Sequence, residues 1–293
     1  MNIGVVGGGS VGLLLSSYLA LNHNITVYVR REEQKKAINH SGILLAHSEM
    51  PISVNCLLIE ELKKEDCIVI CVKQTGVASV IKYLCQENED TPLLFLQNGM
   101  GHLDLVNKMK QPVFLGTVEH GALKIDDRTV KHSGIGNIKL APYNQDPENS
   151  EELSRQLHQG NFPVFPTEDW WGLLAEKLVI NAVINPLTAM FDCKNGEILK
   201  NNYILKLAEK LCRETSQILG LNEKEQWERV KKVAEKTGSN YSSMCTDIKR
   251  NRKTEIEAIS GYLLKNSEKK ATPFTVFVYY SIKALEVKKG IIE

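Results

Sequence analysis

The chain has 293 residues, and its 36 Lys and Arg nearly balance its 35 Asp and Glu. This length is enough for two domains with substantial cores, and the balanced charge excludes a global field that would hold nucleic acid or an anionic membrane. The basic group from Lys249 to Lys253 is expected to be a solvated helix face, because acidic and apolar residues resume at Glu255. Seven scattered cysteines without a CxxC pair, and the lack of a basic leader, predict reduced thiols, no metal site and a cytoplasmic protein.

A glycine-rich turn follows the first apolar strand, residues 3–6, and precedes an apolar helix expected over residues 11–21. In such a GxGxxG pattern the first glycine allows a tight turn, the second lets the backbone approach a pyrophosphate, and the third lets helix pack on strand. The helix N-terminus then offers unpaired N–H groups to phosphate. The pattern predicts a dinucleotide site, and the alternative is a glycine turn without a ligand. The candidate cofactor-binding residues here are Gly7, Gly8, Gly9, Ser10, Val11 and Gly12.

The second apolar strand, residues 25–29, is followed by Arg30 and Arg31. A dinucleotide fold places the side chain that reads the adenosine ribose about 20 residues past the glycines. A carboxylate there would bond the ribose 2′-hydroxyl, whereas a guanidinium can pair with a 2′-phosphate. Arg30 therefore predicts NADPH as the cofactor. The alternative is a pair of solvated arginines at the start of a charged helix with Glu32 and Glu33.

Short apolar runs alternate with helical patterns through the first half of the chain, an order typical of a parallel sheet. Between Gly121 and Ala141 the residues alternate and turns appear, so we expect antiparallel strands added at the edge of the sheet. The strands expected in the parallel sheet cover residues 3–6, 25–29, 67–72, 93–96 and 113–116.

Helical periodicity dominates from about Asp169 onward. We expect a dinucleotide-binding α/β domain over residues 1–166 and an almost wholly α-helical domain over residues 167–293. Pro163 and Pro166 support this boundary, which follows a last helix over residues 149–160. The helices expected in the second domain cover residues 170–191, 203–220, 223–236, 254–265 and 274–287.

Lys73 and Asn98 each follow one of the expected strands. The carboxyl ends of strands in an open parallel sheet are where ligands bind, so both residues are candidates for cofactor contact. The alternatives are a solvated lysine at a strand end and a simple turn at the Asn98-Gly99 dipeptide.

Lys177, Asn181 and Asn185 stand at i, i+4 and i+8 in an otherwise apolar helix. This spacing puts them on one narrow stripe, which should line a cleft because apolar residues fill most of the remaining circumference. A lysine against apolar walls can act as a proton donor near neutral pH. The alternative is a lysine that snorkels to solvent beside two asparagines that pair within a helical core.

These motifs together resemble those of the ketopantoate reductase family over essentially the whole chain. The motifs that carry the resemblance are the glycine turn, Arg30, Val72-Lys73, residues 97–101, residues 177–188, residues 242–248 and residues 253–257. The resemblance implies a Rossmann-type domain followed by an all-α domain like the C-terminal domain of 6-phosphogluconate dehydrogenase. It also implies NADPH-dependent reduction of 2-dehydropantoate to (R)-pantoate, a step in pantothenate and coenzyme A biosynthesis.

The resemblance implies roles for individual residues as well. In the family, the lysine that matches Lys177 is the general acid, and the acid that matches Glu255 supports the substrate site, so these two are the candidate catalytic residues. The candidate substrate-binding residues are Asn98, Lys177, Asn181, Asn185, Asn240 and Ser243, with the looser match at Asn240. Outside the glycine turn, the candidate cofactor-binding residues are Arg30, Lys73, Asn98 and Glu255.

One residue departs from the family pattern and two other functions stay open. Glu119 stands where relatives more often carry a small hydroxyl or apolar residue; we expect it to face solvent, and the alternative is a carboxylate that alters substrate preference. The chain could instead be another NADP-dependent 2-oxo acid or β-hydroxy acid dehydrogenase of the same architecture. The other function is a non-enzymatic NADP-binding sensor, against which the intact Lys177 and Glu255 argue. The expected partner is a small-molecule substrate, and the sequence leaves the oligomeric state open, a homodimer included.

Overall fold

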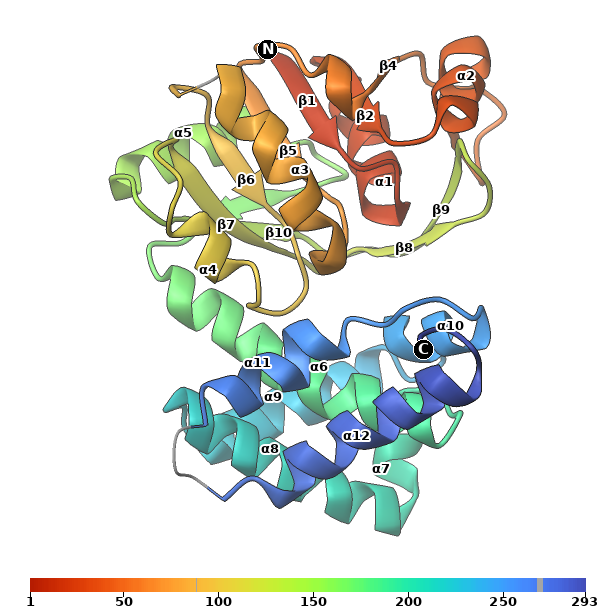
Figure 1. Ribbon diagram of the computed structural model, residues 1–293, viewed down its shortest axis with the longest axis vertical. Helices are drawn as coiled ribbons and strands as arrows, with labels where there is room; N and C mark the ends of the chain where they lie inside the picture. The colour runs from red at the N-terminus through yellow and green to blue at the C-terminus, as the bar shows by residue number, and fades with distance from the viewer. Residues whose placement is uncertain (88, 268–270) are drawn as a thin grey trace. The chain divides into compact units, whose positions relative to one another are not determined.

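The computed structural model describes residues 1–87, 89–267 and 271–293 and divides into two compact units. Unit 1 comprises Met1–Gln97 and Leu103–Leu173, and unit 2 comprises Asn98–His102 and Leu174–Glu293. Strands with flanking helices build unit 1, and helices build unit 2 (Figure 1). This arrangement confirms the expected fold class, a Rossmann-type domain followed by an all-α domain.

An eight-stranded sheet forms the centre of unit 1. Its strands are β1 (Asn2–Val6), β2 (Asn24–Val29), β4 (Asn55–Leu58), β5 (Cys67–Ile70), β6 (Leu93–Phe95), β7 (Val113–Val118), β10 (Ile138–Pro142) and β11 (Val164–Pro166). The strand order is β11-β10-β7-β6-β5-β1-β2-β4, and all strands from β4 to β7 in this order are parallel. The chain builds outward from β1 through β2 to β4 and then returns to the other side of β1 with β5. Such a reversal, at the carboxyl ends of parallel strands, is where ligands of open α/β sheets bind.

All five strands expected in the parallel sheet form. The residues of β5 are fully buried, because helices cover parallel sheets on both faces, and such strands are recognisable as continuous apolar runs. Two strands of the large sheet that were not expected, β4 and β11, are short and lie at its two edges.

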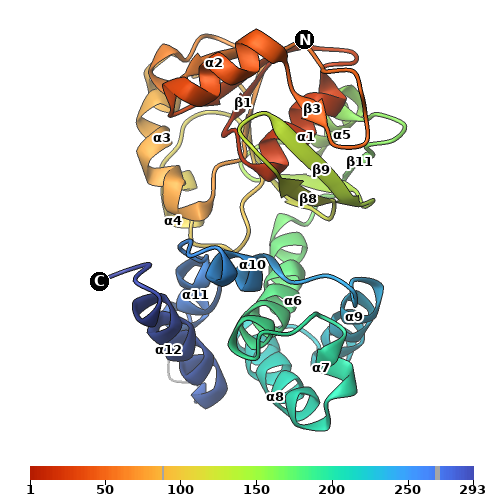
Figure 2. The same cartoon turned by 90° about the vertical axis from the view of Figure 1, so that its right-hand side faces the viewer.

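The segment from Gly121 to Ala141 divides between two sheets. β10 pairs antiparallel with β7 in the large sheet, whereas β8 (Gly121–Lys124) and β9 (Thr129–Gly134) join the short β3 (Leu44–Leu45) in a separate sheet of order β3-β9-β8. The expectation that the whole segment extends the large sheet is therefore wrong for β8 and β9. The physical reason is that helix α1 (Ser10–Leu19) packs against both strands (Figure 2) and gives their apolar side chains a second place to be buried.

Helices surround the large sheet of unit 1. Besides α1, they are α2 (Glu32–Ser41), α3 (Gln74–Glu87), α4 (Leu103–Val106), α5 (Pro147–Leu157) and the 3₁₀ turn η1 (Ile59–Glu61). The last helix expected in this domain, over residues 149–160, corresponds to α5. It begins at Pro147, whose fixed φ suits the first helical position.

Unit 2 is built from helices, three of which begin at a residue whose side chain caps them. The helices of unit 2 are α6 (Trp170–Met190), α7 (Glu197–Lys200), α8 (Asn202–Leu219), α9 (Glu223–Lys236), α10 (Ser243–Lys249), the π-helix η2 (Glu257–Gly261), α11 (Tyr262–Lys265) and α12 (Pro273–Lys288). The Asn201 side chain caps α8 by accepting from Tyr203 N at 3.0 Å, and Gly220 ends it at a φ of +68°. The helix expected over residues 254–265 starts later than predicted, at Glu257, and opens with a π-helical turn.

The apolar composition of α6 follows from its position in unit 2. Among the described residues it is the one helix long and apolar enough to cross a membrane by length and composition, and 67% of its apolar window is buried inside the protein. Burial within unit 2 accounts for that composition. No disulfide joins the six cysteines whose side chains the structure describes, and Cys85 lies outside that set.

Candidate functional site

The glycine turn after β1 takes a conformation that requires glycine at two of its positions. Gly7 has a φ of +117°, and a Cβ there would lie 2.8 Å from Val72 N. A Cβ on Gly12 would lie 1.9 Å from the Gly7 carbonyl oxygen, so the first turn of α1 packs directly on the glycine turn. At Gly9 a Cβ would meet nothing within 4 Å. The turn is therefore tight on its inner side and open at Gly9, which fits the close approach of a pyrophosphate.

The N-terminus of α1 keeps its first N–H groups available. Its N-cap is Gly9, no described side chain caps it, and the first turn carries no acidic residue. Helix N-termini with uncapped N–H groups and no competing carboxylate are suited to bind anions. The backbone at Gly9 and Ser10 thus fits the phosphate groups of a dinucleotide.

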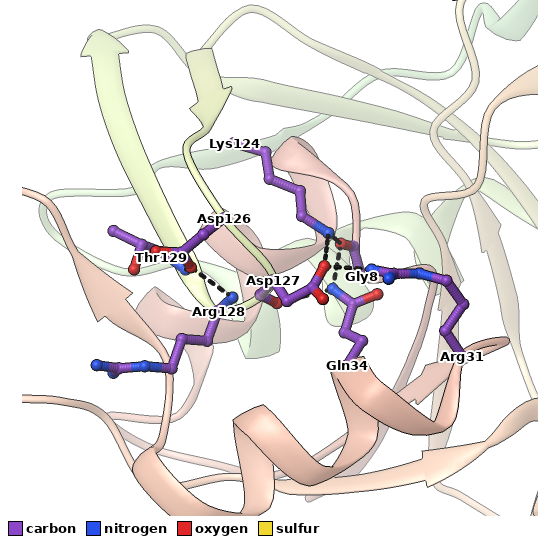
Figure 3. Close-up of polar contacts among 8 residues, drawn as sticks. All are labelled: Gly8, Arg31, Gln34, Lys124, Asp126, Asp127, Arg128 and Thr129. Carbon is purple, nitrogen blue, oxygen red and sulfur yellow. Dashed lines mark hydrogen bonds and ion pairs between the residues drawn. The ribbon is translucent and has the colours of Figure 1, made fainter.

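Side chains from outside the turn hold Gly8 (Figure 3). Its carbonyl accepts hydrogen bonds from Gln34 Nε2 at 2.8 Å and from Lys124 Nζ at 3.0 Å. Gln34 Nε2 also donates to the Asp127 carbonyl at 2.8 Å. The sequence analysis missed Gln34 and Lys124; the one signal nearby was the Asp126-Asp127 turn between β8 and β9.

Arg30 and Arg31 differ in their contacts. Arg31 forms an ion pair with Asp127 Oδ1, and Lys124 Nζ lies 3.3 Å from the same oxygen. Burial raises the pKa of the Asp127 carboxyl, but Arg31 and Lys124 lower it by more, so that it lies below its ordinary value. Arg30 is exposed at the end of β2, and no ion pair or side-chain hydrogen bond joins it to another residue in the described part of the chain. Arg30 is therefore free to meet a ligand, whereas Arg31 is committed to the protein.

Lys73 lies between β5 and α3, at the carboxyl edge of the large sheet. Its side chain is exposed, and its carbonyl accepts from Gly76 N at 2.7 Å at the start of α3. Next to it, Gln97 Nε2 donates to the carbonyls of Ile70, at 2.7 Å, and Val72, at 3.1 Å. These bonds tie the end of β6 to the end of β5, so the sheet edge that carries Lys73 is firmly held.

Asn98 and Glu255 meet in unit 2, although 157 positions separate them in the sequence. Asn98 Nδ2 donates to Glu255 Oε2 at 3.2 Å, and Glu255 is 8% exposed. The adjacent loop is fixed by glycine: Gly99 has a φ of +78°, and a Cβ there would lie 2.3 Å from the Ala258 carbonyl oxygen. Met100 N donates to that same carbonyl at 3.2 Å. The structure thus brings together two of the residues that the sequence singled out.

The segment that carries Glu255 is anchored by α12. Glu286 is 1% exposed, and its Oε1 accepts from both the backbone N–H and the hydroxyl of Thr254, each at 2.8 Å. This anchor explains why the helix expected from residue 254 starts only at Glu257, since the Thr254 backbone is held by α12 instead. The anchored Thr254 backbone and the hydrogen bond from Asn98 thus both restrain Glu255.

Lys177, Asn181 and Asn185, here called the α6 stripe, lie on one face of α6. Lys177 and Asn181 are half-buried, and Asn185 is 7% exposed. Asn181 Nδ2 is buried and has no hydrogen-bond partner among the described residues. Leaving a buried donor unpaired costs about 1–3 kcal/mol. A ligand that offers an acceptor to Asn181 would recover part of that cost.

Ser243 and Asn240 lie at the surface of unit 2. Ser242 caps α10 by accepting from Cys245 N at 3.1 Å, and Thr188 Oγ1 of α6 donates to Ser242 Oγ at 2.7 Å. The first turn of α10, with the exposed Ser243, is therefore fastened to α6. Asn240 is exposed, and its carbonyl accepts from Asn195 N at 2.9 Å.

Glu119, the residue that departs from the family pattern, follows β7 directly. Its side chain is exposed, as expected, and Glu119 Oε2 accepts from Asn137 Nδ2 at 3.3 Å. Glu119 therefore bonds a neighbouring surface residue.

Comparisons with known proteins agree over both units. The chain matches the family model for ketopantoate reductase PanE/ApbA over residues 3–145 and the model for the C-terminal part of the same family over residues 169–286. A 2-dehydropantoate 2-reductase of Bacillus subtilis (strain 168) is 40% identical over an alignment of 292 positions, which covers 98% of each chain. The crystal structure of a probable 2-dehydropantoate 2-reductase from Bacillus subtilis, 39% identical, has a TM-score of 0.88 and covers 97% of this chain and 100% of that one.

A more distant structure shares the fold. The ternary structure of D-mandelate dehydrogenase with NADH and anilino(oxo)acetate has a TM-score of 0.92 at 22% identity and covers 99% of both chains. At 22% identity the structural similarity is evidence for the fold alone. Because the two family models together span both units and a relative matches at 40% identity over nearly the full length, the chain belongs to the ketopantoate reductase family.

Proposed function

We propose that this chain is an NADPH-dependent 2-dehydropantoate 2-reductase, which reduces the C2 ketone of 2-dehydropantoate to (R)-pantoate. The observation that carries the proposal is the α6 stripe, with a half-buried lysine and a buried amide that has no partner among the residues that the structure describes. Membership in the family, with a 40% identical 2-dehydropantoate 2-reductase, supports the choice of substrate. A cytoplasmic location belongs to the proposal as well, and a homodimer stays a prediction.

The glycine turn and Arg30 would hold the cofactor, which supplies the hydride to C2 when bound. The open side at Gly9 and the uncapped start of α1 suit the pyrophosphate. The preference for NADPH is supported by the guanidinium of Arg30, which pairs with no other residue in the described part of the chain and can pair with a 2′-phosphate. Lys73, at the carboxyl edge of the sheet, would contact the ribose next to the nicotinamide.

Lys177 would stabilise and protonate the oxygen that becomes negative during the reduction. An ammonium beside a developing alkoxide both neutralises its charge and supplies the proton. Asn181, with its unpaired amide, would donate to the substrate's hydroxyl or carboxylate, as would Asn185 and Ser243. Short polar side chains lose little entropy when they orient a small 2-oxo acid. Asn240, which is exposed, has weaker support as a substrate-binding residue than the other members of this set.

Glu255 would act through Asn98. Because the Asn98 Nδ2 donates to Glu255 Oε2, the amide is held in one orientation. Its Oδ1 is then left to accept a bond from a ligand hydroxyl. In this proposal Asn98 contacts both cofactor and substrate, and Glu255 fixes the orientation of its amide.

The experiment that tests the proposal follows NADPH absorbance with 2-dehydropantoate and, in parallel, with 2-oxoisovalerate. We expect rapid turnover of 2-dehydropantoate and a loss in kcat of about 10²- to 10⁴-fold in Lys177→Ala, the range typical of a general acid. The dissociation constant for NADPH should be unchanged in this variant. Lys206→Ala, which changes an exposed lysine of α8, is the matched control and should behave as wild type.

Two outcomes would contradict the proposal in different ways. Turnover of 2-oxoisovalerate without turnover of 2-dehydropantoate would assign the chain to another 2-oxo acid reductase of the same architecture. Equal kcat values for wild type and Lys177→Ala would remove Lys177 from the role of proton donor.

A further inference from the structure

Three consecutive glycines, Gly7, Gly8 and Gly9, form the turn that follows β1. Glycine populates both signs of φ, so a run of three leaves the intervening peptide planes free to rotate. A pyrophosphate site needs one orientation of these planes, because each plane carries an N–H on one side and a C=O on the other. Something outside the turn must therefore select the orientation.

Gln34 and Lys124 make that selection at Gly8. Both donate to its carbonyl oxygen, at 2.8 and 3.0 Å (Figure 3). In a trans peptide the C=O of Gly8 and the N–H of Gly9 point in opposite directions. A carbonyl that faces Gln34 and Lys124 therefore keeps the Gly9 N–H on the other side, and a flipped peptide would forfeit both hydrogen bonds.

The two donors are themselves firmly positioned. Gln34 is 5% exposed, and its Nε2 divides its two hydrogens between the carbonyls of Gly8 and Asp127. The Lys124 side chain is 25% exposed and pairs with Asp127. Burial lowers the pKa of Lys124, and the Asp127 carboxylate opposes that effect. A lysine shielded from water forms a stronger hydrogen bond than a solvated one.

The turn between β8 and β9 is rigid enough to serve as the support. Asp126 Oδ1 accepts from Arg128 N at 2.9 Å and from Thr129 N at 2.7 Å, which closes the turn. Arg128 Nη1 donates to the Ser41 carbonyl at 3.1 Å and so fastens the turn to the end of α2. The support therefore joins the second sheet to the helix that carries Gln34.

We propose that Lys124 and Gln34 are positioning residues for the pyrophosphate of the cofactor. They hold the Gly8–Gly9 peptide in the orientation that leaves the Gly9 N–H available to a phosphate, without touching the adenosine 2′-position. This inference rests on the proposed function, because it takes the glycine turn as the cofactor site. It separates two kinds of residue: Lys124 and Gln34 serve any ligand with a pyrophosphate, whereas Arg30 serves the 2′-phosphate of NADPH alone.

The test measures dissociation constants for NADPH, NADH and ADP-ribose by isothermal titration calorimetry. We expect Lys124→Met and Gln34→Met to raise all three constants by about the same factor, on the order of tenfold. Lys124→Arg, which keeps a cationic donor, should restore most of the affinity. Arg30→Ala should raise the constant for NADPH only. Lys131→Met, at an exposed lysine of β9, is the matched control and should change none of them.

The outcomes that overturn the inference are distinct from those that overturn the proposed function. Unchanged constants in Lys124→Met, or a loss confined to NADPH, would show that Lys124 does not position the pyrophosphate. Failure of the wild-type protein to bind any of the three ligands would instead refute the cofactor site itself. If Lys124→Met does not fold, as judged by its circular dichroism, Gln34→Met tests the same inference, because it removes the other hydrogen bond to the Gly8 carbonyl.

Discussion

The glycine turn of unit 1 and the α6 stripe of unit 2 treat their polar groups in opposite ways. The Gly8 carbonyl accepts two side-chain hydrogen bonds, whereas the Asn181 amide is buried with no partner among the described residues. The Gly8 carbonyl is satisfied by the protein's own side chains, so the turn is organised before any ligand arrives. The stripe carries a cost to folding that a ligand can offset. The comparison teaches that an unsatisfied polar group lowers stability at the proposed substrate site, whereas the proposed pyrophosphate site has no such cost at Gly8.

The largest effect is expected from Gly12→Ala. The new Cβ would lie 1.9 Å from the Gly7 carbonyl oxygen, a backbone atom that cannot move without opening the turn. We expect a loss of about 3 kcal/mol in the free energy of unfolding, measured by urea denaturation, together with loss of NADPH binding.

Gly9→Ala is the matched control for that change. Its Cβ meets nothing within 4 Å, so the free energy of unfolding should change by less than about 0.5 kcal/mol, while cofactor binding still weakens because the methyl group occupies the open side. Equal destabilisation in both variants would show that the turn is not as tightly organised as the comparison requires.

A smaller and opposite effect on stability is expected from Asn181→Leu. Removal of an unpaired buried amide should raise the free energy of unfolding by about 1 kcal/mol, while kcat/KM for 2-dehydropantoate falls by at least about tenfold. Urea denaturation and steady-state kinetics measure the two quantities on the same samples.

Replacement of Asn39 by leucine serves as the comparison for Asn181→Leu. Its side chain donates to the Cys56 carbonyl and accepts from Cys56 N, both at 2.8 Å, so Asn39→Leu should destabilise the protein. If Asn181→Leu is destabilising too, the unpaired amide carries no cost and the comparison fails.

A pH-dependent effect is expected from the histidine pair of unit 1. Tyr18 Oη lies 2.8 Å from His132 Nδ1, His132 Nε2 lies 3.1 Å from His120 Nδ1, and His120 Nε2 is buried with no partner among the described residues. Burial, followed by the neighbouring His132, lowers the pKa of His120 from 6.5 to about 4. Like the α6 stripe, the histidine pair has a buried polar atom without a partner among the described residues, although it belongs to the same unit as the glycine turn.

The pH dependence follows from this shift. The unfolded chain takes up a proton at His120 near pH 6.5, whereas the folded protein keeps it neutral down to about pH 4, so the free energy of unfolding falls as the pH drops through that window. Urea midpoints measured inside the window and above it should differ, and His120→Phe should reduce the difference. An unchanged pH dependence in the variant would show that His120 is not the group responsible.

Local patterns in the sequence predicted much of this fold, and the errors have a common cause. The parallel strands and α6 are continuous apolar or periodic runs, whose burial the residues themselves encode. β8 and β9 were placed in the wrong sheet, because their partners, β3 and α1, come from distant parts of the chain.

The same limit applies to the candidate site. The glycine turn and the α6 stripe each depend on spacing within a short stretch of the chain, so the sequence predicts both motifs. The contact between Lys124 and Gly8 joins residues 116 positions apart, and the nearby Asp126-Asp127 turn does not indicate which residue Lys124 contacts. Such contacts arise from tertiary packing alone.

Unit 2 takes residues 98–102 from the middle of the sequence that otherwise builds unit 1. The chain therefore passes from one unit to the other after Gln97, after His102 and after Leu173. A fragment that ends before α6 would carry Met100 without the Ala258 carbonyl that its N–H binds. Neither unit is thus a module that can be excised or exchanged as one continuous stretch, and a chimaera that transplants the helices must transplant this short loop with them.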